Sequence, residues 1–332
     1  MADAPILVTG GAGFIGSHAC KALSLAGFLP VVIDNLCTGH GDSVKWGPFY
    51  ELDVRNSLAV ADVISRHDIR HVMHFAASAY VGESVRNPGK YYQNNIGGMQ
   101  ALLDACVTAK VENLIFSSSC ATYGIPESQP IREDSPQNPI NPYGRTKLIG
   151  EQMIRDYAHA YGIKYATLRY FNACGADPDG ELAERHDPET HLLPLAMLAA
   201  AGLHDELQIF GTDYATQDGT CVRDYIHVDD LAHGHVAALQ HLLDGGASLA
   251  LNLGSGKGHS VLQVLEEIEN VTGRKVPARF AARRPGDPPV LTADPSLAAE
   301  VLGFHTLHSS MAQIIRDAAP FFGLSKKEAQ NA

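Results

Sequence analysis

The sequence predicts an α/β fold in which a doubly wound parallel sheet is followed by a smaller C-terminal α/β region. Apolar, β-branched runs alternate with helical patterns through the first half, a glycine-rich turn follows the first run, and the alternation breaks after Asn172. Such alternation is typical of a parallel sheet covered by helices on both faces. With 332 residues the chain can form about two domains, because a single core rarely grows beyond ~250–300 residues.

Short apolar runs mark the buried strands, since a strand covered on both faces is apolar throughout. The predicted strands are Ile6–Val8, Pro30–Asp34, Val72–Ala76, Leu114–Ser118 and Tyr165–Tyr170. Helical patterns fill the intervals, and proline is well suited to the first position of a helix. The predicted helices are Gly16–Ala26, Pro88–Ala109 and Pro142–Tyr161.

The chain after Asn172 is rich in turn-forming glycine, proline and aspartate, for example in segments 177–180 and 284–289. We expect residues 1–172 to form the first domain and residues 173–332 to form mainly a cap over a ligand. Residues around 220–254 are expected to return in part to the first domain, because the run Leu249–Leu253 suits a further sheet strand.

The composition argues against several classes of protein. A formal net charge of −12 disfavours nucleic-acid binding. No apolar run reaches the ~18 residues of a membrane span, and no signal-peptide pattern follows Met1, so we expect a cytoplasmic protein. The six cysteines lack metal-binding spacing, and His233 and His235 lie on different helical faces, so reduced thiols and no metal site are expected.

A glycine-rich turn stands where the first strand leads into the first helix. Gly10 and Gly13 would let the backbone turn tightly and approach a pyrophosphate, and Gly16 would let the helix pack closely on the sheet. The unpaired N–H groups of a helix N-terminus attract the same anion. Asp34, at the end of the second strand, can accept a hydrogen bond from a ribose hydroxyl and would repel a 2′-phosphate. The first domain is therefore predicted to be a Rossmann-type domain that binds NAD rather than NADP.

Two further segments are weaker candidates for the same site. Asp53-Val54 follows a short strand-like stretch and is placed to meet the adenine edge, and Phe75-Ala76-Ala77 ends another strand beside the cofactor path. Ligands bind at the carboxyl ends of the strands in an open sheet. Because apolar strand ends are equally suited to core packing, both interpretations stay open for these segments.

A tyrosine and a lysine four residues apart predict a catalytic pair. The i, i+4 spacing of Tyr143 and Lys147 places both on one face of a helix. A nearby ammonium and a positively charged nicotinamide both favour the phenolate over the neutral phenol. Ser119 comes directly after another strand, so its hydroxyl is expected at the same edge of the sheet. There it could form a hydrogen bond with the same sugar hydroxyl as Tyr143.

Together these motifs resemble those of the extended short-chain dehydrogenase/reductase family, and within it the UDP-galactose 4-epimerases. The resemblance extends from about Ile6 to Leu324. Four further segments match in order: residues 81–85 (VGESV), 91–95 (YYQNN), 169–172 (RYFN) and 219–228 (GTCVRDYIHV).

The resemblance implies an enzyme that keeps NAD bound and inverts C4 of a UDP-sugar, UDP-galactose to UDP-glucose. C4 would give up its hydride while Tyr143 removes the O4 proton, and the transient 4-keto sugar would turn about its pyrophosphate before the hydride returns. The resemblance adds cofactor contacts at Phe14, Ile15, Asn35, Asn94, Ser117 and Tyr170, and substrate contacts at Asn172, His191, Leu192, Phe210, Arg223, Arg284, Asp287 and Leu291. Of these, Asn172, Arg223, Arg284 and Asp287 would hold the nucleotide diphosphate. The helices 88–109 and 142–161 would pair across a two-fold axis in a homodimer.

Some positions depart from the pattern of this family and keep alternatives open. Ala121 removes a hydroxyl near the sugar, Ala79 replaces a lysine, His191 replaces an asparagine, and Leu291 has an intermediate size at a position that governs sugar choice. A pentose-specific epimerase is one alternative, since pocket shape decides between such substrates. A 4,6-dehydratase and a non-catalytic NAD sensor are the others, although the first would need an acid near Ser119.

Overall fold

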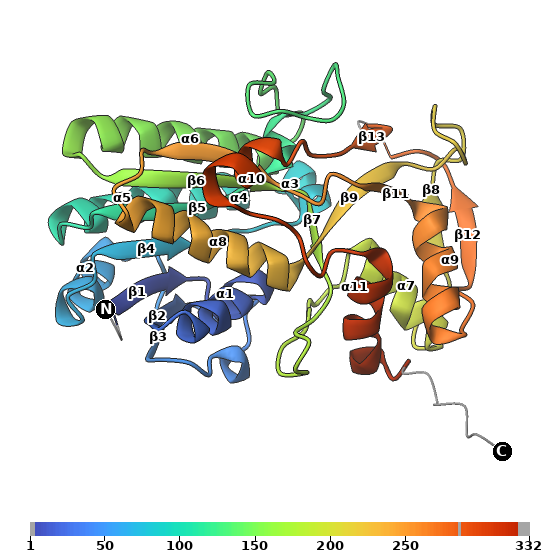
Figure 1. Cartoon of the computed structure of the whole chain (residues 1–332), viewed down its shortest axis with the longest axis horizontal. Coiled ribbons are helices and arrows are strands. Elements are labelled where there is room, and N and C mark those ends of the chain that lie inside the picture. The colour runs from blue at the N-terminus through green and yellow to red at the C-terminus, as the bar shows by residue number, and fades with distance from the viewer. Residues whose placement is uncertain (1–3, 285–286, 325–332) are drawn as a thin grey trace.

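The computed structural model describes residues 4–284 and 287–324 and confirms the predicted α/β fold. Within these residues, a seven-stranded sheet runs in the order β10-β6-β5-β4-β1-β2-β3 (Figure 1), and every neighbouring pair is parallel. The strands are β1 (Ala4–Thr9), β2 (Phe28–Asp34), β3 (Phe49–Glu51), β4 (His71–His74), β5 (Asn113–Ser119), β6 (Lys164–Tyr170) and β10 (Leu249–Leu253). The order reverses between β1 and β4, and a crevice for ligands opens at such a reversal, beyond the carboxyl ends of the strands.

Helices cover both faces of this sheet, which explains why its strands are apolar throughout. One face is covered by α1 (Phe14–Leu25), α8 (Val228–Leu243) and α10 (Ser296–Leu302), whose side chains share a core with β1 and β6. The other is covered by α2 (Ser57–Arg66), α5 (Gly97–Thr108) and α6 (Pro142–Tyr161). The two cores lie on opposite faces because successive side chains of a strand point in opposite directions.

Local sequence sets the ends of α6, the helix that carries the predicted catalytic pair. Asn141 caps it by accepting a hydrogen bond from the Gly144 amide at 2.8 Å, and Pro142 occupies the first position. The helix ends at Gly162, whose φ of 76° is left-handed. The observed range agrees with the predicted one.

The helix predicted over 88–109 is interrupted, in contrast to the single helix expected from the sequence. It is divided into α4 (Pro88–Tyr91), the π-helical turn η2 (Tyr92–Ile96) and α5. The wider turn directs Asn95 inward, where its amide donates to the Ser78 carbonyl at 3.0 Å and to Thr146 Oγ1 at 2.9 Å. Such turns are frequent at functional sites because they reorient side chains.

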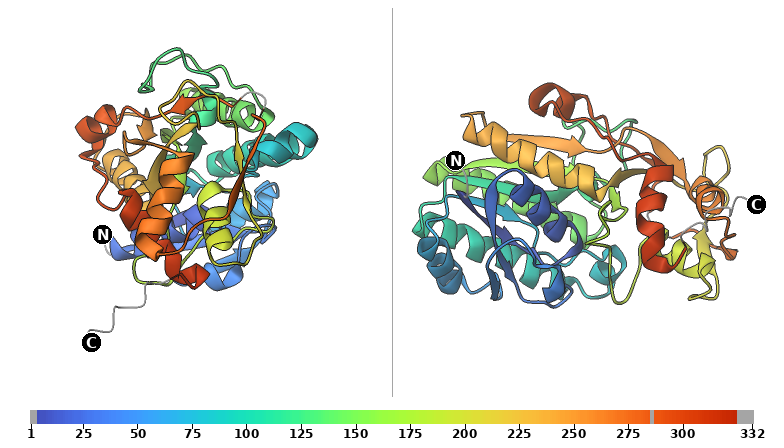
Figure 2. Two further views of the ribbon diagram at one scale, coloured as in Figure 1. Left: turned by 90° about the vertical axis from the view of Figure 1, so that its right-hand side faces the viewer. Right: turned by 60° about the horizontal axis from the view of Figure 1, so that its bottom comes forward.

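While α8, β10 and α10 lie with the large sheet, many of the C-terminal elements gather at one end of the molecule (Figure 1; Figure 2, right). There β9 (Val222–His227) pairs with β7 (Asn172–Cys174), β11 (Gly258–Ser260) and β13 (Val290–Leu291), and β8 (Leu207–Phe210) pairs with β12 (Ala278–Ala281). These strands and α7 (Leu192–Ala200), α9 (Val261–Thr272) and α11 (Met311–Ala318) enclose a separate core. The remaining described elements are η1 (Gly41–Ser43), α3 (Val81–Arg86), η3 (Cys120–Thr122) and η4 (Ala319–Phe322).

Residues 220–254 are divided between the two parts of the molecule. β9 belongs to the C-terminal sheet, whereas α8 packs on α1 and β10 extends the large sheet beside β6. The end of the expected cap, residues 325–332, lies outside the described residues. Among the helices that the structure describes, none is long and apolar enough to cross a membrane.

Three buried histidines predict a loss of stability in acid. Burial lowers the pKa of His18 and His235 to about 4 and that of His74 to about 3. The unfolded chain binds these protons near pH 6.5, so below that pH the unfolded state holds more protons than the native state. We expect the free energy of unfolding, measured in urea, to fall between about pH 6.5 and about pH 5 by up to ~1.4 kcal/mol per histidine per pH unit. A His235→Gln variant should show a shallower fall, and an unchanged slope would contradict this account.

Candidate active site

The glycine turn lies at the point where the strand order reverses. Gly10 has a φ of 75°, and a Cβ atom there would lie 2.6 Å from the Ala76 amide nitrogen. A Cβ atom at Gly16 would overlap the Gly10 carbonyl oxygen. Gly13 is the N-cap of α1 and brings no capping side chain, and the first turn holds no acid. The first N–H groups, at the predicted residues Phe14 and Ile15, therefore lack a side-chain cap, as an anion site requires.

Asp34 ends β2 next to this turn. Its carboxylate accepts hydrogen bonds from the amides of Ala12 at 3.1 Å and Leu36 at 2.9 Å. Burial raises the pKa of Asp34, and these hydrogen bonds oppose the shift. The carboxylate thus orders the turn itself, a role that the sequence pattern did not reveal.

Asp53 and Val54 have different surroundings. Asp53 is paired with Arg55, whose Nη2 lies 2.8 Å away, and accepts a hydrogen bond from Asn35 at 3.1 Å. The Arg55 guanidinium holds the pKa of Asp53 well below its usual range. Val54 is 7% exposed and packs in the core against α2 and α5. Of the two alternatives left open by the sequence, core packing describes Val54, whereas Asp53 and the exposed Asn35 lie at the surface.

The segment after β4 is held against the glycine turn. The amides of Phe75 and Ala76 both donate to the Thr9 carbonyl, at 2.9 and 3.1 Å, so Ala77 follows directly at the same edge of the sheet. Asn94, from the π-helical turn, donates to Ser78 Oγ at 3.2 Å. These contacts bring the predicted cofactor residues 75–77 and 94 to one side of the crevice.

The three predicted catalytic residues meet at the carboxyl end of β5. Lys147 is 3% exposed, and its Nζ atom donates to the Ser117 carbonyl at 2.6 Å and lies 5.8 Å from the centre of the Tyr143 ring. The Ser119 hydroxyl adjoins Tyr143 and lowers the pKa of its phenol, against the larger effect of burial. Tyr143 is only partly buried.

Desolvation dominates the titration of this catalytic pair. It raises the pKa of Tyr143 to about 12, and it lowers the pKa of Lys147 to about 7 while the Glu151 carboxylate opposes the shift. From the sequence we expected the lysine ammonium to favour the phenolate. In this structure the neighbouring Ser119 hydroxyl is the group that lowers the pKa of Tyr143 and so favours its phenolate.

A buried ionic network behind these residues was not recognised from the sequence. Glu151 binds Arg169 through two hydrogen bonds, of 2.8 and 3.0 Å, and accepts a third from Ser118 at 2.6 Å. The side chains of Glu151 and Arg169 are 3% and 6% exposed. The available signal was the helical spacing, since Glu151 follows Lys147 by one turn on the same face.

Tyr170 and Ser117 lie on neighbouring strands at the edge of the sheet near Lys147. Their hydroxyl groups are hydrogen-bonded, and both residues are buried. Burial raises the pKa of Tyr170. The Tyr170 ring packs against His235 with ring centres 5.7 Å apart, and Phe75 contacts the same histidine at 4.8 Å.

The predicted nucleotide-binding residues come from three distant segments. Arg223, at 12% side-chain exposure, is paired with Asp287 and also donates to the Pro288 carbonyl at 2.8 Å. Arg284 covers the Phe210 ring, with its guanidinium carbon 4.1 Å from the ring centre. The Asn172 amide donates to the Asp224 carbonyl at 2.9 Å.

A small apolar cluster is contacted by two of the residues considered from the sequence. Leu291 and Cys120, which follows Ser119 in the chain, both pack against it. The members of the cluster are Tyr123, Ile131, Phe171 and Ala293.

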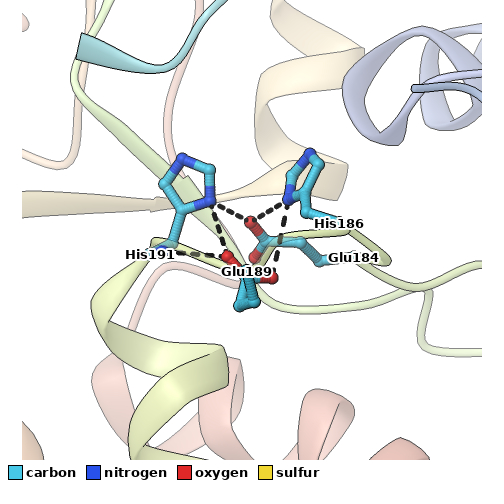
Figure 3. A group of neighbouring side chains, drawn as sticks. All are labelled: Glu184, His186, Glu189 and His191. Atoms are coloured by element: carbon cyan, nitrogen blue, oxygen red, sulfur yellow. Dashed lines mark hydrogen bonds and ion pairs between the residues drawn. The ribbon is translucent and has the colours of Figure 1, made fainter. Parts of the chain in front are cut away.

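His191 and Leu192, at the start of α7, have different surroundings. Leu192 packs on the C-terminal core. The Nδ1 atom of His191 lies 2.8 Å from Glu184 and 3.1 Å from Glu189, and His186 approaches the same two carboxylates (Figure 3). These carboxylates raise the pKa of His191 to about 10 and that of His186 to about 9, against the desolvation that lowers both. Only His191 of this group was singled out from the sequence.

Comparison with known proteins identifies the family. Residues 6–254 match the model of the NAD dependent epimerase/dehydratase family. The UDP-glucose 4-epimerase of Rhizobium meliloti is 51% identical over 299 residues, which cover 90% of this chain and 91% of that protein, and that of Azospirillum brasilense is 49% identical over 94% and 90%.

Solved structures agree with this assignment. The UDP-glucose 4-epimerase of Brucella ovis in complex with NAD matches with a TM-score of 0.95 and 59% identity, over 98% of this chain and 99% of that one. The enzyme of Stenotrophomonas maltophila, with bound NAD and formylated UDP-arabinopyranose, matches with a TM-score of 0.93 and 43% identity, over 96% and 98%. The chain belongs to the NAD dependent epimerase/dehydratase family, in the group of the UDP-glucose 4-epimerases.

Proposed function

We propose that this chain is an NAD-dependent epimerase that inverts C4 of a UDP-sugar, UDP-galactose to UDP-glucose, through a transient 4-keto intermediate and without net redox. One observation carries the proposal: Tyr143, Ser119 and Lys147 meet at the carboxyl edge of the sheet to which the glycine turn also belongs. Family membership supports the same reaction.

The residues around the glycine turn fit NAD. Side chains at Gly10 or Gly16 would collide with the neighbouring backbone, so the chain can approach a pyrophosphate only because both are glycine. The Asp34 carboxylate is placed to accept a hydrogen bond from a ribose hydroxyl. Asn35 and Asp53, which are hydrogen-bonded to each other, follow β2 and β3 beside it. When bound, NAD supplies a hydride acceptor and donor for C4 and a positive charge that favours the Tyr143 phenolate.

Tyr143 is the proposed base for the O4 proton and later the acid that returns it. Ser119 adjoins the phenolic hydroxyl, lowers its pKa, and is proposed to share the sugar hydroxyl with it. Lys147, fixed by the Ser117 carbonyl, is proposed to hold the nicotinamide ribose and to lend positive charge. The remaining residues of the proposed cofactor site are Ser117, Tyr170, Asn94 and residues 75–77.

We propose that residues 1–172 hold the cofactor. The C-terminal part is proposed to hold the nucleotide diphosphate of the substrate. Arginine suits this task because its planar fork pairs with phosphate oxygens. Arg223 and Arg284 are the proposed phosphate ligands, with Asn172 and Asp287 beside them. His191, Leu192, Phe210 and Leu291 are proposed to shape the pocket around the uridine and the sugar.

Incubation with UDP-galactose and identification of the product test this function, and the rival functions give different results. A 4-keto-6-deoxy sugar would show a dehydratase, although the short helix η3 after Ser119 carries Cys120 and Ala121 and no acid to expel water. Bound NAD without any turnover would show a sensor. UDP-N-acetylgalactosamine and UDP-xylose belong in the same assay, because Leu291 leaves the sugar choice open.

We further propose a homodimer in which α5 and α6 pair with the same helices of a second copy. Both helices lie side by side on one face of the sheet, and nearby large side chains such as Tyr161, Tyr92 and Val85 are 59%, 38% and 62% exposed. Isologous pairing would bury them. Sedimentation equilibrium should show twice the chain mass, and a monomeric mass would contradict the pairing. As expected from the sequence, we also propose a cytoplasmic location for the enzyme.

Replacing Asp34 by asparagine is expected to weaken NAD binding and to reduce the preference over NADP. Asparagine keeps the size and one acceptor oxygen but loses the charge, and hydrogen bonds to charged groups contribute about 1.5–3 kcal/mol. The ratio of the two Kd values should therefore fall about tenfold. Titration of both cofactors by fluorescence measures it, with Asp68→Asn, an exposed position after α2, as the control. An unchanged ratio would refute the assignment of Asp34.

A further inference from the structure

Two histidines and two glutamates converge in the segment between β7 and α7. We refer to Glu184, His186, Glu189 and His191 as the His–Glu cluster. The Nδ1 atom of each ring points toward the two carboxylates, which lie between the rings (Figure 3). His191 Nδ1 is 2.8 Å from Glu184 Oε1 and 3.1 Å from Glu189 Oε1, and His186 Nδ1 is 3.1 Å from Glu184 Oε1 and 3.6 Å from Glu189 Oε2.

These distances suit four ligands of one metal ion. Zinc binds imidazole nitrogen and carboxylate oxygen at about 2.0–2.2 Å in a tetrahedron, which places neighbouring ligand atoms about 3.3–3.6 Å apart. One ligand atom from each residue of the cluster lies within 4.8 Å of all the others. The four histidine–glutamate distances, 2.8–3.6 Å, lie close to this tetrahedral spacing.

Hydrogen bonds satisfy Glu189 but not His186. Glu189 Oε1 accepts from the amides of Thr190 and His191 at 2.7 and 2.8 Å and from His191 Nδ1 at 3.1 Å. A ring nitrogen carries at most one hydrogen, yet each Nδ1 atom faces two carboxylate oxygens. Among the described residues, His186 Nδ1 is buried and has no hydrogen-bond partner, although Glu184 Oε1 lies 3.1 Å away. The side chains of Glu184 and Glu189 are 5% and 10% exposed. Buried carboxylates require a cationic partner, which the protonated rings supply while no metal is bound. A metal ion would displace those protons and bind the lone pairs of both rings at the same time.

We propose that the His–Glu cluster binds one divalent transition-metal ion of the zinc class. Two imidazoles and two carboxylates suit zinc, whereas magnesium and calcium prefer six or more oxygen ligands. From the sequence we expected no metal site, and the spacing Glu-x-His-x-x-Glu-x-His matches none of the motifs considered there. Only the folding of this segment brings the four groups together.

A second carboxylate group nearby is arranged around a lysine instead. Asp177, Asp179 and Glu181 surround the ammonium of Lys21, with Nζ to oxygen distances of 2.7, 2.7 and 2.8 Å. The centre of that group is therefore occupied by a side-chain cation. In the part of the chain that the structure describes, no lysine or arginine enters the His–Glu cluster in this way, and only histidine rings face its carboxylates as cationic groups.

The position of the cluster indicates a structural role for the metal. The His186 ring packs edge-on against Phe14, at the start of α1, and against Tyr80, with ring centres 6.3 and 5.9 Å apart. His191 stands directly before α7. Because all four ligands lie in segment 184–191, a bound ion would rigidify this segment, which lies beside the proposed cofactor turn and leads into α7. The ion would fix the orientation of His191, which is also proposed to line the substrate pocket, and would take no part in the chemical step.

Zinc titration of the chelator-treated full chain tests this proposal. Cys37→Ser serves as the background, because Cys37 is the exposed thiol among the described cysteines. We expect about one zinc ion per chain by elemental analysis, a rise in Tm on zinc addition, and no comparable effect of magnesium. Glu184→Gln and His186→Ala should each lower zinc affinity at least tenfold, as loss of even an outer-shell partner does.

His233→Ala is the matched control, since His233 is 58% exposed and faces a single carboxylate, Asp229, at 3.5 Å. It should bind zinc like the parent chain. Circular dichroism verifies that each variant is folded, and the two cluster variants are independent, so a folding defect in one leaves the other informative. Absence of saturable zinc binding, or equal binding by parent and cluster variants, would overturn the proposal. None of these measurements depends on turnover, so failure of the proposed function would be recognised separately.

Discussion

Tyr143→Phe is expected to lower kcat for epimerisation of UDP-galactose by about 10²–10⁴-fold, the range typical of a lost acid–base group. The substitution removes only the phenolic hydroxyl, whose pKa the neighbouring Ser119 lowers. Lys147 keeps its own contact with the Ser117 carbonyl, and the glycine turn is untouched, so bound NAD should remain. Steady-state kinetics and the absorbance of the bound cofactor measure the two effects.

Tyr161→Phe provides the control for this experiment. Tyr161 ends the same helix but is 59% exposed and distant from Ser119 in sequence and position. It should epimerise at the rate of the parent enzyme. Turnover of Tyr143→Phe at that rate would refute the assigned base, whereas loss of NAD from the variant would mean that the phenol serves the cofactor instead.

Glu151→Ala is expected to cost about 3–5 kcal/mol of unfolding free energy, because it leaves a buried guanidinium without its partner. Arg169 is 6% exposed on its side chain and depends on Glu151 for two hydrogen bonds. The pKa of Arg169 is raised by this contact, which shows that the charged form is the one that the fold stabilises. Urea denaturation followed by circular dichroism measures the difference.

The exposed pair of Asp62 and Arg66 supplies the comparison for this effect. Its side chains are 64% and 58% exposed, and such pairs contribute about 0–1 kcal/mol. Asp62→Ala should therefore leave the denaturation curve almost unchanged. If both variants lost a similar amount of unfolding free energy, burial would not be what determines how much the Glu151 network contributes to stability.

Local patterns were sufficient to predict the large sheet and the residues at its edge. A glycine turn between a strand and a helix, and a tyrosine one helical turn before a lysine, place Gly10, Gly16, Tyr143 and Lys147 through backbone geometry alone. The ends of α6 were predicted for the same reason, since Pro142 and Gly162 act through their own backbone preferences.

What the sequence by itself determined was therefore local: which segments form strands and helices, and which chemical groups emerge at the carboxyl edge of the sheet. Only the tertiary structure decided which of these groups become buried and which partners they meet. Val54 enters the core, Glu151 meets Arg169, and the four members of the His–Glu cluster face one another. The physical reason is that desolvation and charge pairing depend on neighbours from distant segments, and hydrophobic periodicity carries no record of those neighbours.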